Sequence, residues 1–330
     1  MSIAELSNDF DHVTKHLPAE GTIAYVDFPV HKNAGDILIF LGTMELFRRH
    51  NIKIGRTLST LDMSSRHLDH AAGAETIVCH GGGNLGDIYP RPQALREAII
   101  TRAQDAKVII FPQSIQFHDP ARLRTASEIF RKHENLTVFT RDQPSFDLAK
   151  RHLAEEVVLS QDMAHALYDW LAPIRAERPR REDGRQRTLQ FLRQDLEVGQ
   201  TPDIDLSSAS HVDGPIDWPD LLTLNDKLLF EAYRRAAVAS KLLPVLPIGF
   251  LLNYEAFCKR LIIRLARRFI QYDHVVTSRL HGAIFSLLLD RRVTVIDNSY
   301  GKNSRYADQW LKDVPNLEIG FRSDVKSAGM

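Results

Sequence analysis

Short apolar segments alternate with segments of helical periodicity along most of the chain. In the first half the apolar segments lie at 22–28, 76–80, 107–113, 136–142 and 157–162, and the helical segments lie at 36–50, 92–106, 119–134 and 144–153. The apolar segments are short and contain few polar positions, as is typical of strands buried on both faces. Such alternation predicts an α/β fold with a mostly parallel, doubly wound sheet.

A second set of the same kind follows. Its predicted strands are 188–193, 274–278 and 292–297, and its predicted helices are 225–243, 255–273 and 282–290. The intervening segment 173–187 is rich in arginine, contains proline and has no periodicity, which indicates a linker or an exposed loop. A chain of 330 residues can hold two such units. We therefore expect two Rossmann-like doubly wound domains facing a cleft, at 1–172 and 188–330, with the C-terminal tail packing back on the first.

Charge and cysteine content narrow the class of protein. Lys and Arg together number 42, as do Asp and Glu, so no basic excess favours a nucleic-acid partner. Cys79 and Cys258 are too few and too far apart for a disulfide scaffold or a zinc motif, which fits a reducing cytoplasm. The N-terminus lacks the apolar core of a signal peptide, and no run of about 18 apolar residues occurs. We expect a cytoplasmic protein.

Polar turns follow several predicted strands, at the edge where open α/β sheets bind ligands. Gly81–Gly83 come directly after 76–80, and Asn84, Asp87 and Tyr89 follow them. Glycines let the backbone turn tightly and approach a ligand closely. A tight turn with no ligand is the alternative, and the spacing fits neither a Walker phosphate loop nor the dinucleotide fingerprint.

The turn after 22–28 has the same character, with Asn33, Gly35 and Asp36. Asp36 is either a site residue or simply an N-terminal cap or first-turn acid of the next helix, and its position does not separate the two interpretations. Arginines end two other strands, Arg141 in the first half and Arg193 in the second. Each either faces the cleft or forms a structural salt bridge, since a buried unpaired guanidinium is costly.

The segment HVVTSRLHG combines the features of an anion site. An apolar strand runs into Ser278, Arg279 and His281, and Gly282 opens an apolar helix. The N–H groups of a helix start attract anions, and an arginine fork suits carboxylate or phosphate. A histidine there can give or take a proton near neutral pH. Ser299 and Lys302, after the last predicted strand, suit phosphate or sugar hydroxyls, or form a polar turn.

Six segments, in this order, resemble the polysaccharide pyruvyl transferases. They are NAGD (33–36), HGGGNLGDIY (80–89), FPQSIQF (111–117), TRDQPS (140–145), SRLHG (278–282) and DNSYGKN (297–303). The resemblance implies an architecture similar to the two-domain GT-B glycosyltransferases. It also implies transfer of pyruvate from phosphoenolpyruvate onto two hydroxyls of one sugar, which forms a cyclic ketal and releases phosphate. That chemistry requires no metal and no other cofactor.

The resemblance further implies roles for particular residues. Arg279 and His281 would bind the donor together with a second arginine, for which we favour Arg141 over Arg193. His281 would protonate the methylene carbon, and Asp36 or Asp87 would take the proton of the attacking hydroxyl. The donor site would also include Ser278, Gly282, Ser299 and Lys302. The acceptor, a sugar on an oligosaccharide carried by a lipid, would meet the loop residues Asn33, Gly35, Gly82, Gly83, Asn84 and Tyr89.

Two alternatives to this function share the predicted fold: a nucleotide-sugar glycosyltransferase, and a sugar- or anion-binding module without turnover. The segment 258–270 also allows two interpretations. Its apolar residues recur at helical spacing among Lys259, Arg260, Arg264, Arg267 and Arg268. The helix either lies on an anionic membrane or packs on the sheet as a crossover, and we favour the crossover.

Overall fold

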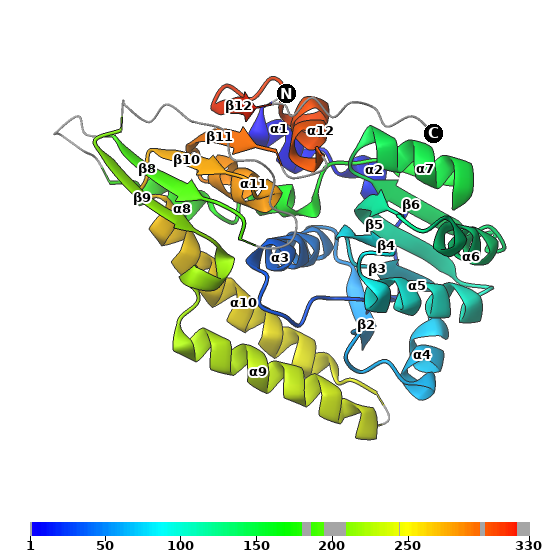
Figure 1. The fold of residues 1–330 in the computed structure, drawn as a ribbon. Coiled ribbons are helices and arrows are strands. Elements are labelled where there is room, and N and C mark those ends of the chain that lie inside the picture. The colour runs from blue at the N-terminus through cyan, green and yellow to red at the C-terminus, as the bar shows by residue number, and fades with distance from the viewer. Residues whose placement is uncertain (1, 180–185, 195–208, 244, 298–300, 322–330) are drawn as a thin grey trace.

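The computed structural model describes residues 2–179, 186–194, 209–243, 245–297 and 301–321 (Figure 1). The predicted site residue Ser299 and the tail beyond 321 lie outside the described residues. The chain forms two parallel sheets with helices packed around them, so the predicted α/β class is confirmed.

The first sheet is built from residues 22–159. Its strands are β1 (Thr22–Val26), β2 (Lys53–Leu58), β3 (Thr76–Cys79), β4 (Gly82–Gly86), β5 (Lys107–Gln116), β6 (Leu136–Thr140) and β7 (Glu156–Leu159). They lie in the order β2-β1-β3-β5-β6-β7, with β4 paired to β5, and every pairing is parallel. The accompanying helices are α3 (Ala34–Arg49), α4 (Ser65–Ala72), α5 (Pro90–Arg102), α6 (Pro120–Phe130) and α7 (Gln143–His152).

The second sheet is built from residues 187–321. Its strands are β8 (Arg187–Phe191), β9 (His211–Ile216), β10 (His274–Thr277), β11 (Arg292–Ile296) and β12 (Leu317–Phe321), in the order β12-β11-β10-β8-β9. Its helices are α8 (Ala172–Ala176), α9 (Leu224–Ala239), α10 (Ile248–Phe269), α11 (Leu280–Leu288) and α12 (Lys302–Tyr306). Helices α1 (Ile3–Asn8) and α2 (Asp11–Thr14) precede the first sheet, and the 3-10 segments η1 (Met163–Leu167) and η3 (Ser240–Leu242) follow β7 and α9.

Both sheets reverse their strand order at one internal pair. In the first sheet β2 lies on one side of β1 and β3 on the other, and in the second sheet β9 and β10 flank β8 in the same way. The crossovers on the two sides of such a pair diverge and leave a crevice outside the strands' carboxyl ends. The topology therefore marks two places for a ligand, after β1 and β3 and after β8 and β10.

The segment 258–270, for which the sequence allowed either a membrane-bound helix or a crossover helix packed on the sheet, lies in α10. Leu261, Ile262, Leu265 and Phe269 are each at most 2% exposed and belong to the main hydrophobic core. The apolar face of 258–270 is thus packed inside the protein, as a crossover helix requires, and it is not available to a membrane. Within the described residues, no helix is both long and apolar enough to cross a bilayer.

Candidate functional site

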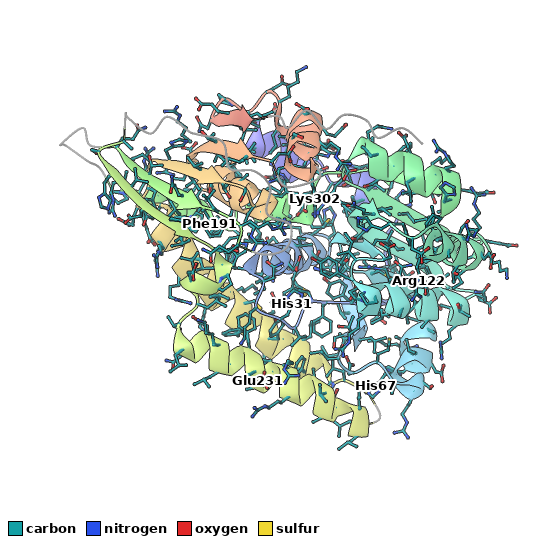
Figure 2. The ribbon with its side chains drawn as sticks, viewed as in Figure 1. His31, His67, Arg122, Phe191, Glu231 and Lys302 are labelled. Carbon is teal, nitrogen blue, oxygen red and sulfur yellow. The ribbon has the colours of Figure 1, made fainter. Side chains whose placement is uncertain are left out.

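A cavity of about 560 Å³ lies where the two sets of strand ends meet. Figure 2 labels His31 and Lys302, two of its lining residues, which lie toward the middle of the molecule. Ten of the residues predicted for the site line it: Asn33, Asp36, Gly83, Asn84, Tyr89, Arg141, Arg193, Arg279, His281 and Lys302. They come from β4, from the first turns of α3, α11 and α12, and from the connections that follow β1, β4, β6, β8 and β10, so segments far apart in sequence share one surface.

The start of α3 lies against His281 of α11. A Cβ atom on Gly35 would lie 2.7 Å from Nδ1 of His281, so only glycine allows the imidazole this position. Gly35 does not line the cavity itself, but it contacts His281, which does.

His281 is held from its other nitrogen by a buried carboxylate. Its Nε2 lies 3.2 Å from Oδ2 of Asp162, which follows β7 and is 1% exposed. Burial alone would raise the pKa of Asp162, but the charges of His281 and Arg141 and the N–H of Ala164 hold the pKa well below its ordinary value. Asp162 therefore stays ionised and fixes the imidazole against the cavity wall.

Arg141 is fully buried beneath the same surface. Its NH1 donates to Asp162 at 2.5 Å and its Nε donates to Ser114 Oγ at 3.0 Å. Its NH2 has no hydrogen-bond partner among the described residues, and it lies 2.9 Å from where a Cβ on Gly83 would be. The ammonium of Lys302 crowds the same Cβ position. An unsatisfied buried donor is costly, so this corner of the cavity is arranged for an anion to accept the bond.

Arg279 is oriented by a carboxylate that the sequence analysis did not select. Its Nε donates to Oδ1 of Asp217 at 2.8 Å, and its NH2 donates to Oδ2 of the same side chain. Asp217 is 2% exposed and also accepts the N–H groups of Gln194 and Trp218. This bidentate pair fixes the plane of a guanidinium that lines the cavity.

Of the two aspartates considered as bases, Asp36 lines the cavity and Asp87 does not. Asp36 accepts a hydrogen bond from Asn33 Nδ2 at 2.9 Å and lies 3.5 Å from His31 Nε2. The N-cap of α3 is Asn33, whose side chain accepts the N–H of Gly35, and Asp36 is the acidic residue of the first turn. Asp36 therefore has the first-turn position of the structural interpretation and also lines the cavity.

Asp87 instead holds two segments of the backbone together. Its carboxylate accepts the N–H groups of His118 and Asp119, both at 2.7 Å. Partial burial raises the pKa of Asp87, and these two N–H groups outweigh it and leave the pKa below its ordinary value. The carboxylate thus ties the end of β4 to the chain between β5 and α6.

Three more predicted residues support the site without lining it. Gly82 adopts a φ of +137°, which bends the chain between β3 and the cavity. A Cβ on Gly282 would meet Thr277 Oγ1 at 2.6 Å and the ring of Phe191 at 2.7 Å, so this glycine packs α11 onto the strands. Ser278 Oγ accepts the N–H of Arg193 at 2.8 Å and joins the ends of β8 and β10.

Cationic side chains outnumber acidic ones in the lining of the cavity, although Asp162 and Asp217 pair with two of them, Arg141 and Arg279, from behind the wall. Its described lining includes Arg91, Arg141, Arg193, Arg279 and Lys302, and its only carboxylate is that of Asp36. The first turn of α11, with Leu280 and His281, faces the same space and adds the positive end of a helix. Such a site attracts a small ligand with more than one negative group. No group of three His, Cys, Asp or Glu side chains in the described chain is placed to hold a metal ion.

The sequence model of one protein family, described as polysaccharide pyruvyl transferase, matches residues 33–300. The chain belongs to this family. A relative from Bacillus subtilis (strain 168), named "Putative pyruvyl transferase EpsO", is 33% identical over 96% of this chain and 94% of its own length. "Pyruvyl transferase 1" of Schizosaccharomyces pombe is 28% identical over 88% of this chain and 69% of its own.

Other relatives share the fold or the family region more distantly. "General stress protein 30" of Bacillus subtilis is 26% identical over 76% of this chain and 66% of its own length. A crystal structure of an uncharacterised protein from Klebsiella pneumoniae superposes with a TM-score of 0.57 at 21% identity, over 97% of this chain and all of that one. At that identity the structural similarity concerns the fold alone.

Proposed function

We propose that this pyruvyl transferase takes its pyruvyl group from phosphoenolpyruvate. The acceptor is a sugar on an oligosaccharide carried by a lipid, and the product is a cyclic ketal formed with two of its hydroxyls. Family membership supports pyruvyl transfer to a polysaccharide in general. The observation that carries the choice of donor is the cavity corner where Arg141 NH2 lacks a partner, among the described residues, beside Lys302 and Gly83.

Phosphoenolpyruvate matches this corner because it carries a carboxylate and a phosphate on three carbons. Arg141, Arg279 and Lys302 provide three cationic groups for the two anions, and Arg193 is a further candidate. The N–H groups of the first turn of α11 add donors for a phosphate oxygen. The fixed arginines lose little conformational freedom when the donor binds, since Asp162 and Asp217 already orient them.

In the proposed reaction His281 gives a proton to the methylene carbon of the donor. The adjacent carbon becomes electron-deficient and is attacked by one sugar hydroxyl, whose proton passes to Asp36. A second hydroxyl then attacks the same carbon, and the C–O bond to phosphate breaks. Of the two hydroxyl protons, one restores the proton that His281 gave and the other leaves on the phosphate. Asp162 acts as a positioning residue that orients the imidazole.

The two sheets correspond, in this proposal, to two Rossmann-like domains arranged as in the GT-B glycosyltransferases. The first, 1–172, would bind the acceptor and the second, 188–330, the donor. The matching strand reversals at β1/β3 and β8/β10 support this division, since each places one ligand-binding edge at the shared cavity.

Titration calorimetry tests the donor. Phosphoenolpyruvate is expected to bind, and Arg141→Lys to weaken binding at least about tenfold, because lysine replaces a fixed fork with a single point charge. Arg122→Lys on the exposed surface of α6 is the matched control. Binding of a nucleoside diphosphate in preference to phosphoenolpyruvate would instead indicate a glycosyltransferase. Phosphate release and the pyruvyl mass on a glycolipid, measured by mass spectrometry, test the reaction itself.

A further inference from the structure

The glycine segment that leads into β4 is held by a buried arginine of α5. Arg96 is completely buried, and its NH1 donates a hydrogen bond to the backbone carbonyl of Asn84 at 3.0 Å. Its NH2 donates to Oδ1 of the same residue at 2.7 Å and to the carboxylate of Asp27 at 2.5 Å. Asp27 follows β1 and is 4% exposed. Arg96 thus pairs with a buried carboxylate and holds both the backbone and the side chain of Asn84.

A second buried side chain holds the same segment. Nε2 of Gln113, in β5, donates to the carbonyl of His80 at 2.7 Å, and its Oε1 accepts the N–H of Asn84 at 3.3 Å. The carbonyl and the N–H of Asn84 therefore both have partners, one in α5 and one in β5. Because two elements fix the backbone of Asn84, the freedom that remains to this residue lies in its side chain.

The contact with Arg96 decides which way the side-chain amide of Asn84 faces. A guanidinium has only N–H groups to offer, so the atom of Asn84 next to Arg96 has to be the acceptor Oδ1. The amide nitrogen is on the other branch of the same group and turns away from Arg96. Asn84 is partly exposed and lines the cavity, and its Nδ2 has no hydrogen-bond partner within the described part of the chain. The branch of Asn84 that remains for a ligand is therefore a donor of two N–H bonds.

This amide lies next to the corner of the cavity that is arranged for an anion. Gly83, the preceding residue, is the place where Arg141 NH2 and the ammonium of Lys302 approach the same point. Gly83, Asn84 and Lys302 also line a smaller pocket together, so the three residues border one space. A neutral N–H donor beside two cations gives an anion one more hydrogen bond, and bonds to ionised acceptors are stronger than bonds between neutral groups.

We propose that Asn84 donates a hydrogen bond to an anionic oxygen of the donor substrate, on its phosphate or its carboxylate. Arg96 is the positioning residue that keeps the amide turned toward the cavity. The identity of the donor rests on the proposed function, whereas the direction of the amide follows from the contacts with Arg96 alone. Asn84 is thereby assigned to the donor, and not to the acceptor loop to which the sequence resemblance assigned it.

Replacement of Asn84 by aspartate tests the amide. Asn84→Asp keeps an oxygen for Arg96 and exchanges the N–H groups for an anionic oxygen. The affinity for phosphoenolpyruvate, measured by titration calorimetry, should therefore fall at least about tenfold. Asn135→Asp is the matched control, because it makes the same charge change at an exposed position just before β6, away from the carboxyl ends of the strands. Equal affinity of the parent and Asn84→Asp would overturn the proposal.

A double-mutant cycle tests Arg96. Arg96→Gln should weaken the binding of phosphoenolpyruvate at least about fivefold, because the amide of Asn84 is then free to turn. In an Asn84→Ala background the same substitution should have no further effect, since no amide is left to orient. Equal losses in the two backgrounds would indicate a purely structural role and would overturn the positioning. Arg96→Lys, which also offers only N–H groups, should retain most of the affinity.

Two further measurements separate the possible failures. Denaturant unfolding of each variant shows whether binding is measured on folded protein, and the Asn84 variants decide the direct contact without any change at Arg96. Inorganic phosphate and pyruvate, titrated singly, identify the group that is bound: Asn84→Asp should weaken the binding of one of them, and equal binding of both would overturn the contact. A parent protein that does not bind phosphoenolpyruvate would overturn the proposed function. Weaker phosphate binding by Asn84→Asp would then still support the direction of the amide.

Discussion

At the scale of single residues, the site is defined by buried carboxylates that fix cationic side chains. Asp162 contacts both Arg141 and His281, and Asp217 holds Arg279 through two bonds. Both carboxylates are almost completely buried, and the removal of their charges from water is unfavourable to folding. What they achieve is orientation: the groups that face the cavity have little freedom to turn away from it.

The replacement of His281 by alanine tests its role as proton donor. We expect turnover to fall at least about 100-fold, the usual scale for loss of a general acid. Binding of phosphoenolpyruvate should persist, since the arginines remain in place. Steady-state rates of phosphate release and calorimetric affinity measure the two effects separately. His50→Ala, on the surface after α3, is the control, and near-normal turnover in His281→Ala would remove this residue from the mechanism.

At the scale of elements, the close approach of α3 and α11 decides where His281 lies. Gly35 is the second residue of α3, and its missing side chain leaves room for the imidazole. Gly249 is the second residue of α10, and open space surrounds the point where a Cβ on it would lie, with no neighbouring atom within 4 Å. The two glycines thus occupy equivalent helix positions, but a side chain would clash at Gly35 and would meet open space at Gly249.

Alanine at these two positions should separate activity from stability. Alanine is a better helix former than glycine by about 1 kcal/mol, so Gly249→Ala should raise the free energy of unfolding slightly and leave turnover unchanged. Gly35→Ala should displace the His281 ring and lower turnover at least about tenfold, since small misplacements of catalytic groups are costly. Chemical denaturation and phosphate release measure the pair. Full activity in Gly35→Ala would show that the ring position is unimportant.

At the scale of the whole molecule, buried histidines couple folding to pH. His80 and His165 are at most 1% exposed, and burial lowers their pKa to about 3 and about 4, against 6.5 for a free histidine. Both are therefore neutral in the folded protein at pH values where the unfolded chain binds protons. Each contributes stability that is complete above pH 6.5 and is lost as the pH falls toward its folded pKa, at about 1.4 kcal/mol per pH unit.

Removal of one of these histidines should flatten the acid side of the stability profile. In the parent, His165 Nε2 lies 3.0 Å from the hydroxyl of Tyr306. The His165→Gln variant places a side-chain amide near that position but has no group that titrates. Between pH 6 and 4.5, we expect the unfolding free energy of the variant to fall less steeply with pH than that of the parent. The difference in slope should correspond to up to about one proton fewer taken up on unfolding. Denaturant unfolding at a series of pH values gives this slope, and His50→Gln serves as the surface control. A slope equal to the parent's would contradict the assignment.

Much of the fold was predictable because its strands are strongly apolar. The predicted strands and helices of both halves are present, with ends shifted by a few residues. Several short helices and the strands β2, β4, β9 and β12 were missed. Among these strands, β2 and β9 are partly exposed edge strands with charged or Gly-Pro residues, and β4 is formed by the glycine segment itself. Edge strands bury only part of their surface, so their sequences carry little of the periodicity that marks a strand.

The sequence by itself determined the sheet class and most of the cationic residues of the site, because strand ends and helix starts follow from local pattern. The tertiary structure decided which of these residues meet. Asp162 ends a predicted strand but gained its role only through contact with Arg141 and His281, from distant parts of the chain. It likewise decided that the apolar face of 258–270 is buried and that the leucines of α9 are not. Such outcomes depend on which surfaces pack together, and that is a property of the folded chain rather than of any one segment.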